Sequence, residues 1–394
     1  MILSKVSNHF ILLTKSQHAL KGFCAAVCQI NTATFTIEEP KRRVPVHEDD
    51  FKALRKTRPI QPENPHRLKV SILGEPNAGK STLTNSLVRW KVCSVSKKVH
   101  TTRRRSAAVL VQENKQIVFL DTPGLVSAEH SKKHSLEPSF VMDPMRSVRE
   151  ADLIAVIIDV SNKYTNSRIS PNILEILSEC KDKKSILVLN KIDAMKSKDR
   201  LLHLVKVLTE GTLYDFFISK FGEQAAKQLS IEEISDETNK HANQDCVVDS
   251  EGVEERKGWP YFSRVFMVSA LRNNGVEDLR NYLLSEVVPG NWPFSDNMVT
   301  DQHPHEIALM TVREKLLEYL PQEIPYAVDL YVASWEILST GCPKINIKIK
   351  CNNARHKRFV IGPSGKHIAA CVEKTRLALR ESFRKDVVLN IGVV

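Results

Sequence analysis

The sequence predicts an α/β domain, built on a mostly parallel sheet with helices on both faces, followed by a smaller α+β domain. From residue 68 onward, short runs rich in Val, Ile and Leu alternate with amphipathic stretches of helical length. A glycine-rich loop joins the first of these runs to the start of a helix. After residue 303 the pattern changes to helix, strand, strand, helix and strand. The 394 residues leave room for two or three domains of ordinary size.

Six apolar runs are the expected strands of the first domain. Each is short and rich in Val, Ile and Leu, a composition typical of strands buried on both faces. They are residues 68–73, 107–111, 116–120, 153–159, 185–190 and 264–269. In the second domain, helices are expected at 304–320 and about 366–384, and strands near 327–334, near 344–351 and at 386–393.

Changes in composition divide the chain into further segments. Residues 41–66 are rich in charge and proline and are predicted to be a charged, mostly solvated connector. The first domain is expected at 67–290, with an acidic insertion at about 220–258 that lacks apolar periodicity. Residues 291–303 are interpreted as a linker, and the second domain is expected at 304–394.

Residues 1–40 are predicted to be a mitochondrial transit peptide. No acidic residue precedes Glu38, while Lys5, Lys15 and Lys21 alternate with apolar, Ser and Thr residues. Organelle presequences avoid acids because they cross a negatively polarised membrane as cationic amphipathic helices. The alternative is a frayed N-terminus without a targeting role. The expected location is the mitochondrial matrix, with a peripheral contact with the inner membrane as an open alternative that nothing in the sequence supports.

The overall composition is that of a basic protein with free thiols. The chain has 57 Lys and Arg against 46 Asp and Glu, a net charge of +11 and a pI near 9.2. This balance favours a polyanionic partner without identifying one. The eight cysteines form no Cys-x-x-Cys pair, so a reducing compartment is expected. The longest apolar runs fall far short of the roughly 20 residues that span a bilayer.

The stretch GEPNAGKST at 74–82 has the pattern G-x-x-x-x-G-K-[ST] between a strand and a helix. In that setting, main-chain amides and the positive end of the helix hold a β-phosphate. Lys80 is expected to reach the β- and γ-phosphates, and the Ser81 hydroxyl to bind magnesium. The alternative is a tight turn that contains a lysine by chance. The predicted nucleotide-binding residues here are Gly74, Glu75, Pro76, Asn77, Ala78, Gly79, Lys80, Ser81 and Thr82.

The tetrapeptide NKID at 190–193 is expected to select the base. A carboxylate can accept both N–H groups that guanine presents at N1 and N2, and adenine offers no such pair, so Asp193 should select guanine. Asn190 would contact the base and brace the phosphate loop, while the Lys191 stem would lie over the ring. Taken alone, the tetrapeptide is also a helix-start signal in which Asn or Asp caps the helix. Its position after the phosphate loop and a DTPG segment favours guanine recognition.

Three further segments complete the predicted nucleotide site. In DTPG at 121–124, Asp121 is expected to hold magnesium through a water, and the Gly124 amide to sense the γ-phosphate. An ordinary turn is the alternative. The stretch HTTRRR at 100–105 is expected to deliver Thr102, or else Thr101, to the metal, and the backbone of SAL at 269–271 to contact the guanine oxygen. The remaining nucleotide-binding residues are Thr122, Pro123, Ser269, Ala270 and Leu271.

Hydrolysis at this site is expected to be slow without assistance. Many such domains orient the attacking water with a Gln after the DxxG segment, and Leu125 holds that place here. Phosphoryl transfer depends almost wholly on positioning and on neutralising developing charge. A potassium ion beside the phosphates, held in part by Asn77, is one source of charge, and a turn-capping Asn77 is the equal alternative. The residues assigned to catalysis are Lys80, Thr102, Gly124 and Asn77.

The second domain contains a Gly-x-x-Gly loop, Gly362 to Gly365, after an apolar run and directly before a helix. With flanking strands, this is the arrangement in which a KH loop clamps an RNA backbone. Residues 341–394 hold twelve Lys or Arg against three acids, and many of these bases gather near the loop. The alternative is a solvated basic face. The predicted RNA-binding residues are Lys350, Arg358, Ile361, Gly362, Pro363, Ser364, Gly365 and Lys366.

Together, GEPNAGKST, TTRRR, DTPGL, NKID, SAL and the later FVIGPSGKHI resemble the Era family of GTPases. The resemblance covers about residues 66–394 apart from the acidic insertion, and the expected presequence is similar to a mitochondrial member. It implies an α/β P-loop G domain followed by an α+β type II KH domain. It also implies GTP or GDP with magnesium as ligands, and the 3′ region of small-subunit ribosomal RNA as partner.

The leading hypothesis is therefore a GTPase that binds small-subunit ribosomal RNA and acts in assembly of the mitochondrial small ribosomal subunit. The alternative is a GTP-dependent RNA-binding chaperone without significant hydrolysis of its own, which Leu125 keeps open. A tRNA-modifying GTPase is disfavoured by the C-terminal domain. The sequence does not decide the oligomeric state.

Overall fold

The fold was analysed in a computed structural model of the whole chain. Residues 42–394 form one compact unit. The structure describes residues 42–95, 106–121, 139–162, 166–195, 198–213, 256–320 and 324–394. The predicted transit peptide and nearly all of the predicted acidic insertion lie outside these ranges. In the described part of the chain, no helix combines the length and apolar character needed to cross a membrane.

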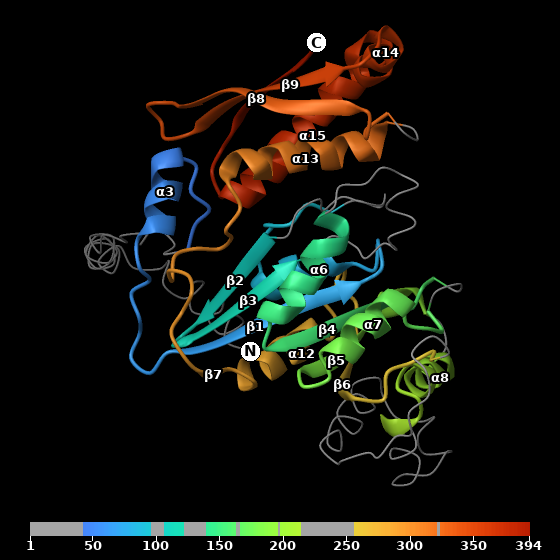
Figure 1. Cartoon of the computed structure of the whole chain (residues 1–394). Coiled ribbons are helices and arrows are strands. Elements are labelled where there is room, and N and C mark those ends of the chain that lie inside the picture. The colour runs from blue at the N-terminus through green and yellow to red at the C-terminus, as the bar shows by residue number, and fades with distance from the viewer. Residues whose placement is uncertain are drawn as a thin grey trace, which may run out of the picture. The chain divides into compact units, whose positions relative to one another are not determined.

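The first domain is built on a seven-stranded sheet (Figure 1). Six strands follow the order β2-β3-β1-β4-β5-β6, and a short seventh, β7, pairs with β1. All pairings are parallel except β2 with β3 and β7 with β1. The six expected strands are thus confirmed. Their bounds are His66–Gly74 (β1), Ser106–Gln112 (β2), Lys115–Asp121 (β3), Leu153–Asp159 (β4), Lys184–Asn190 (β5), Phe262–Val268 (β6) and Val288–Pro289 (β7).

Helices cover both faces of this sheet, as predicted. Side chains of the central strands alternate between two buried clusters, because successive residues of a strand point to opposite faces. One cluster contains apolar residues of α4 and α12, and the other contains those of α6, α7 and α8. Figure 1 shows α6 and α7 over the near face and α12 behind the sheet. The helices are Lys80–Val88 (α4), Ser139–Glu150 (α6), Pro171–Glu179 (α7), Lys198–Leu208 (α8) and Val276–Ser285 (α12).

The second domain has the order helix, strand, strand, helix, helix, strand. Its sheet has the strand order β10-β9-β8, with β8 antiparallel and β10 parallel to β9. Helices α13 and α15 pack on each other, and their apolar residues share a buried cluster with the sheet. The elements are Pro304–Tyr319 (α13), Val328–Ile337 (β8), Pro343–Cys351 (β9), Ala354–Ile361 (α14), Lys366–Phe383 (α15) and Val388–Val393 (β10).

Helix α14 was not predicted, because its sequence ARHKRFVI lacks an apolar stripe and buries only Val360. The signal for it lies at its ends. Asn353 caps the helix by accepting a hydrogen bond from the His356 amide at 2.7 Å, and Gly362 follows its last residue. The apolar run before the Gly-x-x-Gly loop is therefore the last turn of a helix.

The segment predicted as a solvated connector is instead partly folded. It contains helix α3 (Glu48–Lys56), and Val44, Val46 and Phe51 are buried. The indole nitrogen of Trp335 on β8 donates to the Val46 carbonyl at 2.8 Å. Because these few apolar residues lie among many charged ones, the composition of the segment does not predict that it packs.

The predicted linker at 291–303 also packs closely. Trp292 is buried and donates through its indole nitrogen to the His66 carbonyl at 3.0 Å. Further along, the Val299 carbonyl accepts from the Val109 amide at 2.8 Å, at the edge of β2. The linker therefore covers the exposed edge of the first sheet, which would otherwise present unpaired backbone groups.

Candidate nucleotide site and basic loop

The phosphate loop lies between the end of β1 at Gly74 and the start of α4 at Lys80. Gly79 caps the helix with φ of 94°, a left-handed conformation that favours glycine. A Cβ built on Gly79 would lie 2.3 Å from Asn190 Nδ2, so a side chain has no room here. Asn77 also has positive φ, at 63°. The loop is therefore a tight, glycine-dependent turn that leads its backbone into a helix N-terminus, as anion binding requires.

Lys80 is folded back over this loop. Its Nζ donates to the carbonyls of Gly74 at 3.0 Å and Glu75 at 2.9 Å, and the residue is 6% exposed. Burial lowers the pKa of Lys80 to about 8, although Asp121 and Glu75 act in the opposite direction. Neutral carbonyls satisfy a buried ammonium poorly compared with anionic oxygens. The side chain is thus positioned to exchange these carbonyls for phosphate oxygens.

Ser81 and Asp121 meet beside the loop. The Ser81 hydroxyl donates to Asp121 Oδ2 at 2.8 Å, and Asp121 is fully buried at the end of β3. Its Oδ1 has no hydrogen-bond donor in the described part of the structure. Burial raises the pKa of Asp121, while Lys80 and the Ser81 hydroxyl oppose the rise. A hydroxyl and an under-satisfied carboxylate are hard oxygen donors, which fits a magnesium site with few protein ligands.

Asp193 and Ser269 form a second corner of the site. Asp193 follows β5, Ser269 follows β6, and the Ser269 hydroxyl donates to Asp193 Oδ1 at 2.6 Å. Arg272 Nε lies 3.7 Å from Asp193 Oδ2. Asp193 is exposed while Ser269 is 1% exposed, so a buried hydroxyl orients an accessible carboxylate. This geometry is suited to a ligand that offers N–H donors.

Asn190 joins the two corners from inside the protein. Its Nδ2 donates to the Ala78 carbonyl at 2.9 Å, and its Oδ1 accepts from the Ala270 amide at 3.1 Å. The side chain is 1% exposed. The expected bracing of the phosphate loop is thus present. The expected contact with the base stays a prediction, because the amide nitrogen keeps a second N–H and the oxygen a second lone pair for a ligand.

Lys191 lies across the site and contacts Asp159, a residue that the sequence analysis did not predict. Its Nζ donates to the Asn77 carbonyl at 2.7 Å and to Asp159 Oδ2 at 2.5 Å. Asp159 ends β4 and also accepts from the Ser161 hydroxyl and amide. The available signal was an Asp at the carboxyl end of a parallel strand, where ligand sites collect.

The structure brings together residues of four of the five predicted segments at one edge of the sheet, with DTPG represented by Asp121 alone. Leu271, next to Ser269 and Ala270, is 82% exposed. The predicted residues Thr101, Thr102, Thr122, Pro123 and Gly124, and also Leu125, lie outside the described residues. Their roles stay predictions.

The Gly-x-x-Gly loop joins α14 to α15. Gly362 has φ 74° and ψ 176°, a conformation open in practice to glycine alone. A Cβ on Gly362 would lie 2.4 Å from the His367 ring, whereas Gly365, with φ of 75°, has open space around it. Ser364 is also left-handed, with φ of 50°. The loop is thus a sharp turn with exposed Pro363 and Ser364 at its tip.

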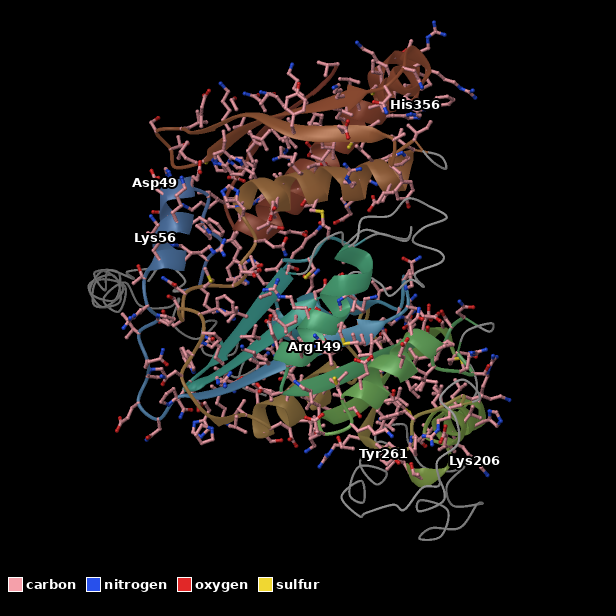
Figure 2. All side chains as sticks on the ribbon, viewed as in Figure 1. Asp49, Lys56, Arg149, Lys206, Tyr261 and His356 are labelled. Carbon is pink, nitrogen blue, oxygen red and sulfur yellow. The ribbon has the colours of Figure 1, made fainter. Side chains whose placement is uncertain are left out.

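Exposed bases surround this loop. Lys350 lies next to the last residue of β9, Arg358 lies on α14, and Lys366 opens α15, and all three are exposed. Ile361, the last residue of α14, is partly buried. Figure 2 shows His356 on α14 at the same end of the domain. The loop therefore presents backbone groups among cations, which suits a phosphodiester chain.

Fold and site together define a P-loop nucleotide-binding protein with a KH-like domain after it. Residues 69–191 match a family model described as 50S ribosome-binding GTPase. The chain is 38% identical over 364 residues to "GTPase Era, mitochondrial" of Danio rerio, covering 90% of this chain and 81% of the relative. It is 31% identical over 324 residues to "GTPase Era" of Agrobacterium fabrum, covering 82% and 84%. The chain belongs to the Era family of GTPases.

A solved structure supports the same assignment. It is that of Era in complex with MgGDPNP and nucleotides 1506–1542 of 16S ribosomal RNA. This chain matches it with a TM-score of 0.61 and 26% identity, over 84% of this chain and 93% of that one. The predicted fold class, a P-loop G domain followed by a type II KH domain, is thereby confirmed.

Proposed function

We propose that the protein binds and hydrolyses GTP with magnesium, and that it binds small-subunit ribosomal RNA through the Gly362–Gly365 loop. The observation that carries the nucleotide part is the Asp193–Ser269 corner, held in register with the phosphate loop by Asn190. A base-reading carboxylate and a phosphate cradle fixed to each other in this way suit guanosine phosphates.

Each residue of the site has a proposed task. The amides at the start of α4 and Lys80 would hold the β- and γ-phosphates. Ser81, Asp121 and Thr102 would hold magnesium, which neutralises charge that develops on the transferred phosphoryl group. The Gly124 amide would respond to the γ-phosphate. Asp193 would accept from the guanine edge, and the Lys191 stem would cover the ring.

Slow intrinsic hydrolysis belongs to the same proposal. Leu125 can neither donate nor accept a hydrogen bond, so another group must position the attacking water. The left-handed Asn77 supports its role as a turn residue. A potassium ion held in part by Asn77 remains a candidate source of charge. Comparing GTP turnover in potassium and sodium salts at equal ionic strength tests it, since a turn residue alone gives equal rates.

The RNA part rests on the geometry of the loop and on the relatives. The Era structure described above contains a 16S ribosomal RNA fragment, and the exposed bases near Gly362 suit such a ligand. We infer that the ligand here is the 3′ region of the small-subunit ribosomal RNA, and that the protein acts in assembly of that subunit. Sequencing RNA crosslinked to the protein in cells tests this, and enrichment of tRNA would contradict it.

The proposed compartment is the mitochondrial matrix. Relatives from Danio rerio, Salmo salar and Caenorhabditis elegans are named as mitochondrial, and residues 1–40 have the composition of a presequence. Fractionation of mitochondria followed by carbonate extraction tests the location. Protein released by carbonate from the membrane fraction would indicate a peripheral contact with the inner membrane instead.

The alternative function is an RNA chaperone that binds GTP without significant hydrolysis. Multiple-turnover hydrolysis with and without the RNA separates the two. The GTPase should release phosphate repeatedly and respond to RNA. A single turnover or less, unchanged by RNA, favours the chaperone.

A further inference from the structure

Arginines from distant parts of the chain gather where the first domain contacts the second. Arg42 Nη2 donates to the Val109 carbonyl on β2. Arg280 on α12 reaches the end of the same strand, with its Nη2 3.4 Å from Gln112 Oε1. We call the group formed by Arg42, Arg89, Arg280 and Arg384 the arginine cluster.

The other two members connect the ends of two helices. Arg89 follows α4, and Arg384 follows α15. Arg384 Nη2 lies 3.4 Å from the Arg89 carbonyl, and its guanidinium carbon lies 3.4 Å from the centre of the Trp90 ring. Arg89 in turn pairs with Glu277 on α12 at 2.7 Å, and both of these side chains are largely exposed. The cluster thus has an exposed rim.

The floor of the cluster holds charged donors without acceptors. Arg280 is 8% exposed, and its Nε and Nη1 are buried with no hydrogen-bond partner in the described structure. The buried Nε of Arg42 also has none. Most buried polar atoms are hydrogen-bonded, and an unpaired buried cation is among the costliest exceptions. Two such arginines in one place therefore point to an anion that belongs there.

The surrounding charges agree. Burial lowers the pKa of Arg42 to about 10, and the positive charges of Arg384 and Arg280 contribute. Burial also lowers the pKa of Arg280, with a further contribution from Arg89 that Glu277 opposes. Glu277 is already engaged by Arg89 at the rim. The cations at the floor repel each other, and an anion between them would reverse that repulsion.

We propose that the arginine cluster is a binding site for a phosphate group. The planar guanidinium fork matches two phosphate oxygens, and several forks from different elements can surround one group. A phosphodiester of bound RNA or a free phosphate compound would supply the same chemistry. The exposed Arg89 and Arg384 would close over the group, while Arg42 and Arg280 would receive it.

This site is separate from both sites described above. Arg384 and the Gly-x-x-Gly loop lie at opposite ends of α15, whose 18 residues span roughly 27 Å. Arg89 likewise lies at the end of α4 opposite to Lys80. One nucleotide of RNA cannot reach both ends of α15, so an RNA ligand would have to follow the length of the second domain.

The first test uses the whole chain saturated with magnesium and GDPNP, which fills the phosphate loop. Thermal unfolding is measured with inorganic phosphate and tripolyphosphate, against chloride at equal ionic strength. We expect both phosphates to raise the Tm, and the rise to disappear in Arg280→Gln and Arg384→Gln. Arg146→Gln is the matched control, since Arg146 is exposed on α6 and pairs with nearby Glu150. If Arg280→Gln fails to fold, Arg384→Gln and Arg89→Gln carry the test from the exposed rim.

The second test identifies the source of the phosphate. The affinity for a 3′ fragment of small-subunit ribosomal RNA is measured over a range of salt concentrations. If RNA supplies the group, Arg89→Gln combined with Arg384→Gln should lower the slope of log affinity against log salt by about one. The two arginine replacements should lower the slope by the same amount in a chain in which Gly362 and Gly365 are also replaced by Asp, which separates this site from the loop. A Tm rise with an unchanged slope would support a free phosphate compound as the ligand.

The proposal fails if the phosphates raise the Tm no more than chloride and the slope is unchanged in the double variant. The cluster would then be a structural group of arginines. That result would leave RNA binding by the loop untouched, because replacement of Gly362 and Gly365 tests the loop independently.

Discussion

In the proposed function, Asp193 would carry the selectivity of the nucleotide site through two fixed oxygens. Ser269 holds one of them at 2.6 Å, and the other lies near Arg272. Because a carboxylate accepts only and a carboxamide both donates and accepts, Asp193→Asn should turn one acceptor into a donor.

The expected result of Asp193→Asn is a loss of GTP affinity and a gain for xanthosine triphosphate. The variant loses one hydrogen bond from guanine to a charged acceptor, and its new amide donor faces a guanine N–H. Together these changes should cost about 3 kcal/mol of GTP binding free energy, which is roughly 100-fold in affinity. Competition between the two triphosphates measures it. Asp182→Asn, on an exposed turn far from the site, serves as control. Unchanged preference for GTP would remove Asp193 from base recognition.

Lys80 supports a second prediction at the same scale. Its ammonium donates to the main-chain carbonyls of Gly74 and Glu75, so Lys80→Ala removes a buried charge whose hydrogen-bond acceptors are neutral. Nucleotide affinity should fall by at least 100-fold, since a charge-assisted contact to phosphate is lost. The Tm of the nucleotide-free protein should stay within a few degrees of the parent. Normal GTP affinity in a folded variant would contradict the proposed role.

Single residues also show where sequence reasoning reaches and where it stops. Asp193 and Asn190 could be predicted because a short motif at a strand end fixes both the residue type and its neighbours. Asp159 was missed, because an Asp at the carboxyl end of a strand is only a general signal of a ligand site, and its contact with Lys191 is visible only in the structure. The arginine cluster is further beyond reach, since its members are up to about 340 positions apart in the chain.

At the scale of elements, helix α14 and the loop after it depend on Gly362. Its φ of 74° and ψ of 176° exclude other residues, and a Cβ would press on the His367 ring at 2.4 Å. The two glycines in the sequence predicted the loop. Nothing in the apolar pattern predicted the helix before it. Helix α14 is basic and half-solvated, and prediction by apolar periodicity does not register such a helix.

Gly362→Ala should therefore destabilise the protein more than Gly365→Ala. Both positions have positive φ, yet only Gly362 also meets a neighbouring ring. We expect losses of about 2–3 kcal/mol for Gly362→Ala and about 1 kcal/mol for Gly365→Ala. Urea unfolding of the two variants measures the difference. Equal losses would mean that His367 moves aside without cost.

Helix α3 packs beside a titratable group. Phe51 of α3 contacts the His303 ring at 4.9 Å, His303 contacts His305 at 4.7 Å, and His305 contacts Trp335 at 4.6 Å. Burial lowers the pKa of His305, and the nearby His303 adds to this, while Glu48 opposes it. Protonation of His305 therefore disfavours the folded state.

The consequence for pH dependence follows from linkage. A histidine with a lowered folded pKa contributes stability that is present above its unfolded pKa, near 6.5, and is lost as pH falls through its folded pKa. The Tm of the parent protein should fall as the pH is lowered from 7 to 5. The Tm of His305→Gln should fall less over this interval. His203→Gln, on the exposed side of α8, is the control. Equal falls in parent and His305→Gln would exclude His305 as the cause.

At the scale of the whole molecule, the contact between the two domains surrounds the segment that leads into the predicted metal-binding loop. Glu314 on α13 is 2% exposed and accepts from the Val95 amide at 3.0 Å. It also lies 2.6 Å from Lys315 and 3.7 Å from Lys91. The indole nitrogen of Trp90 reaches across in the same region and donates to the Ser382 carbonyl at 2.7 Å. The patterns of apolar residues along the sequence predicted both domains. No local pattern in the sequence marks a contact between residues more than 200 positions apart.

On the proposed function, this contact would give the nucleotide state a physical route to the second domain. Val95 is the last described residue before the stretch that contains Thr102, so a change in that stretch on GTP binding would pull on the Val95 amide. Glu314 would transmit the pull to α13, which packs on α15. A route of this kind requires the Glu314 carboxylate to hold an amide and two ammonium groups together, which a carboxamide does less well.

Glu314→Gln should therefore uncouple the two ligands while leaving each site intact. The affinity for a 3′ fragment of small-subunit ribosomal RNA is measured with GDPNP and with GDP, and the ratio of the two affinities should approach one in the variant. Breaking a buried ion pair should also cost about 1–3 kcal/mol of stability, measured by urea unfolding. Glu318→Gln is the matched control, because Glu318 pairs with the same Lys315 but is 36% exposed on its side chain. If the RNA affinities of Glu314→Gln with GDPNP and with GDP still differ as in the parent, the domains communicate through another contact. In that case the Val95 amide has lost its charged acceptor without effect on the coupling.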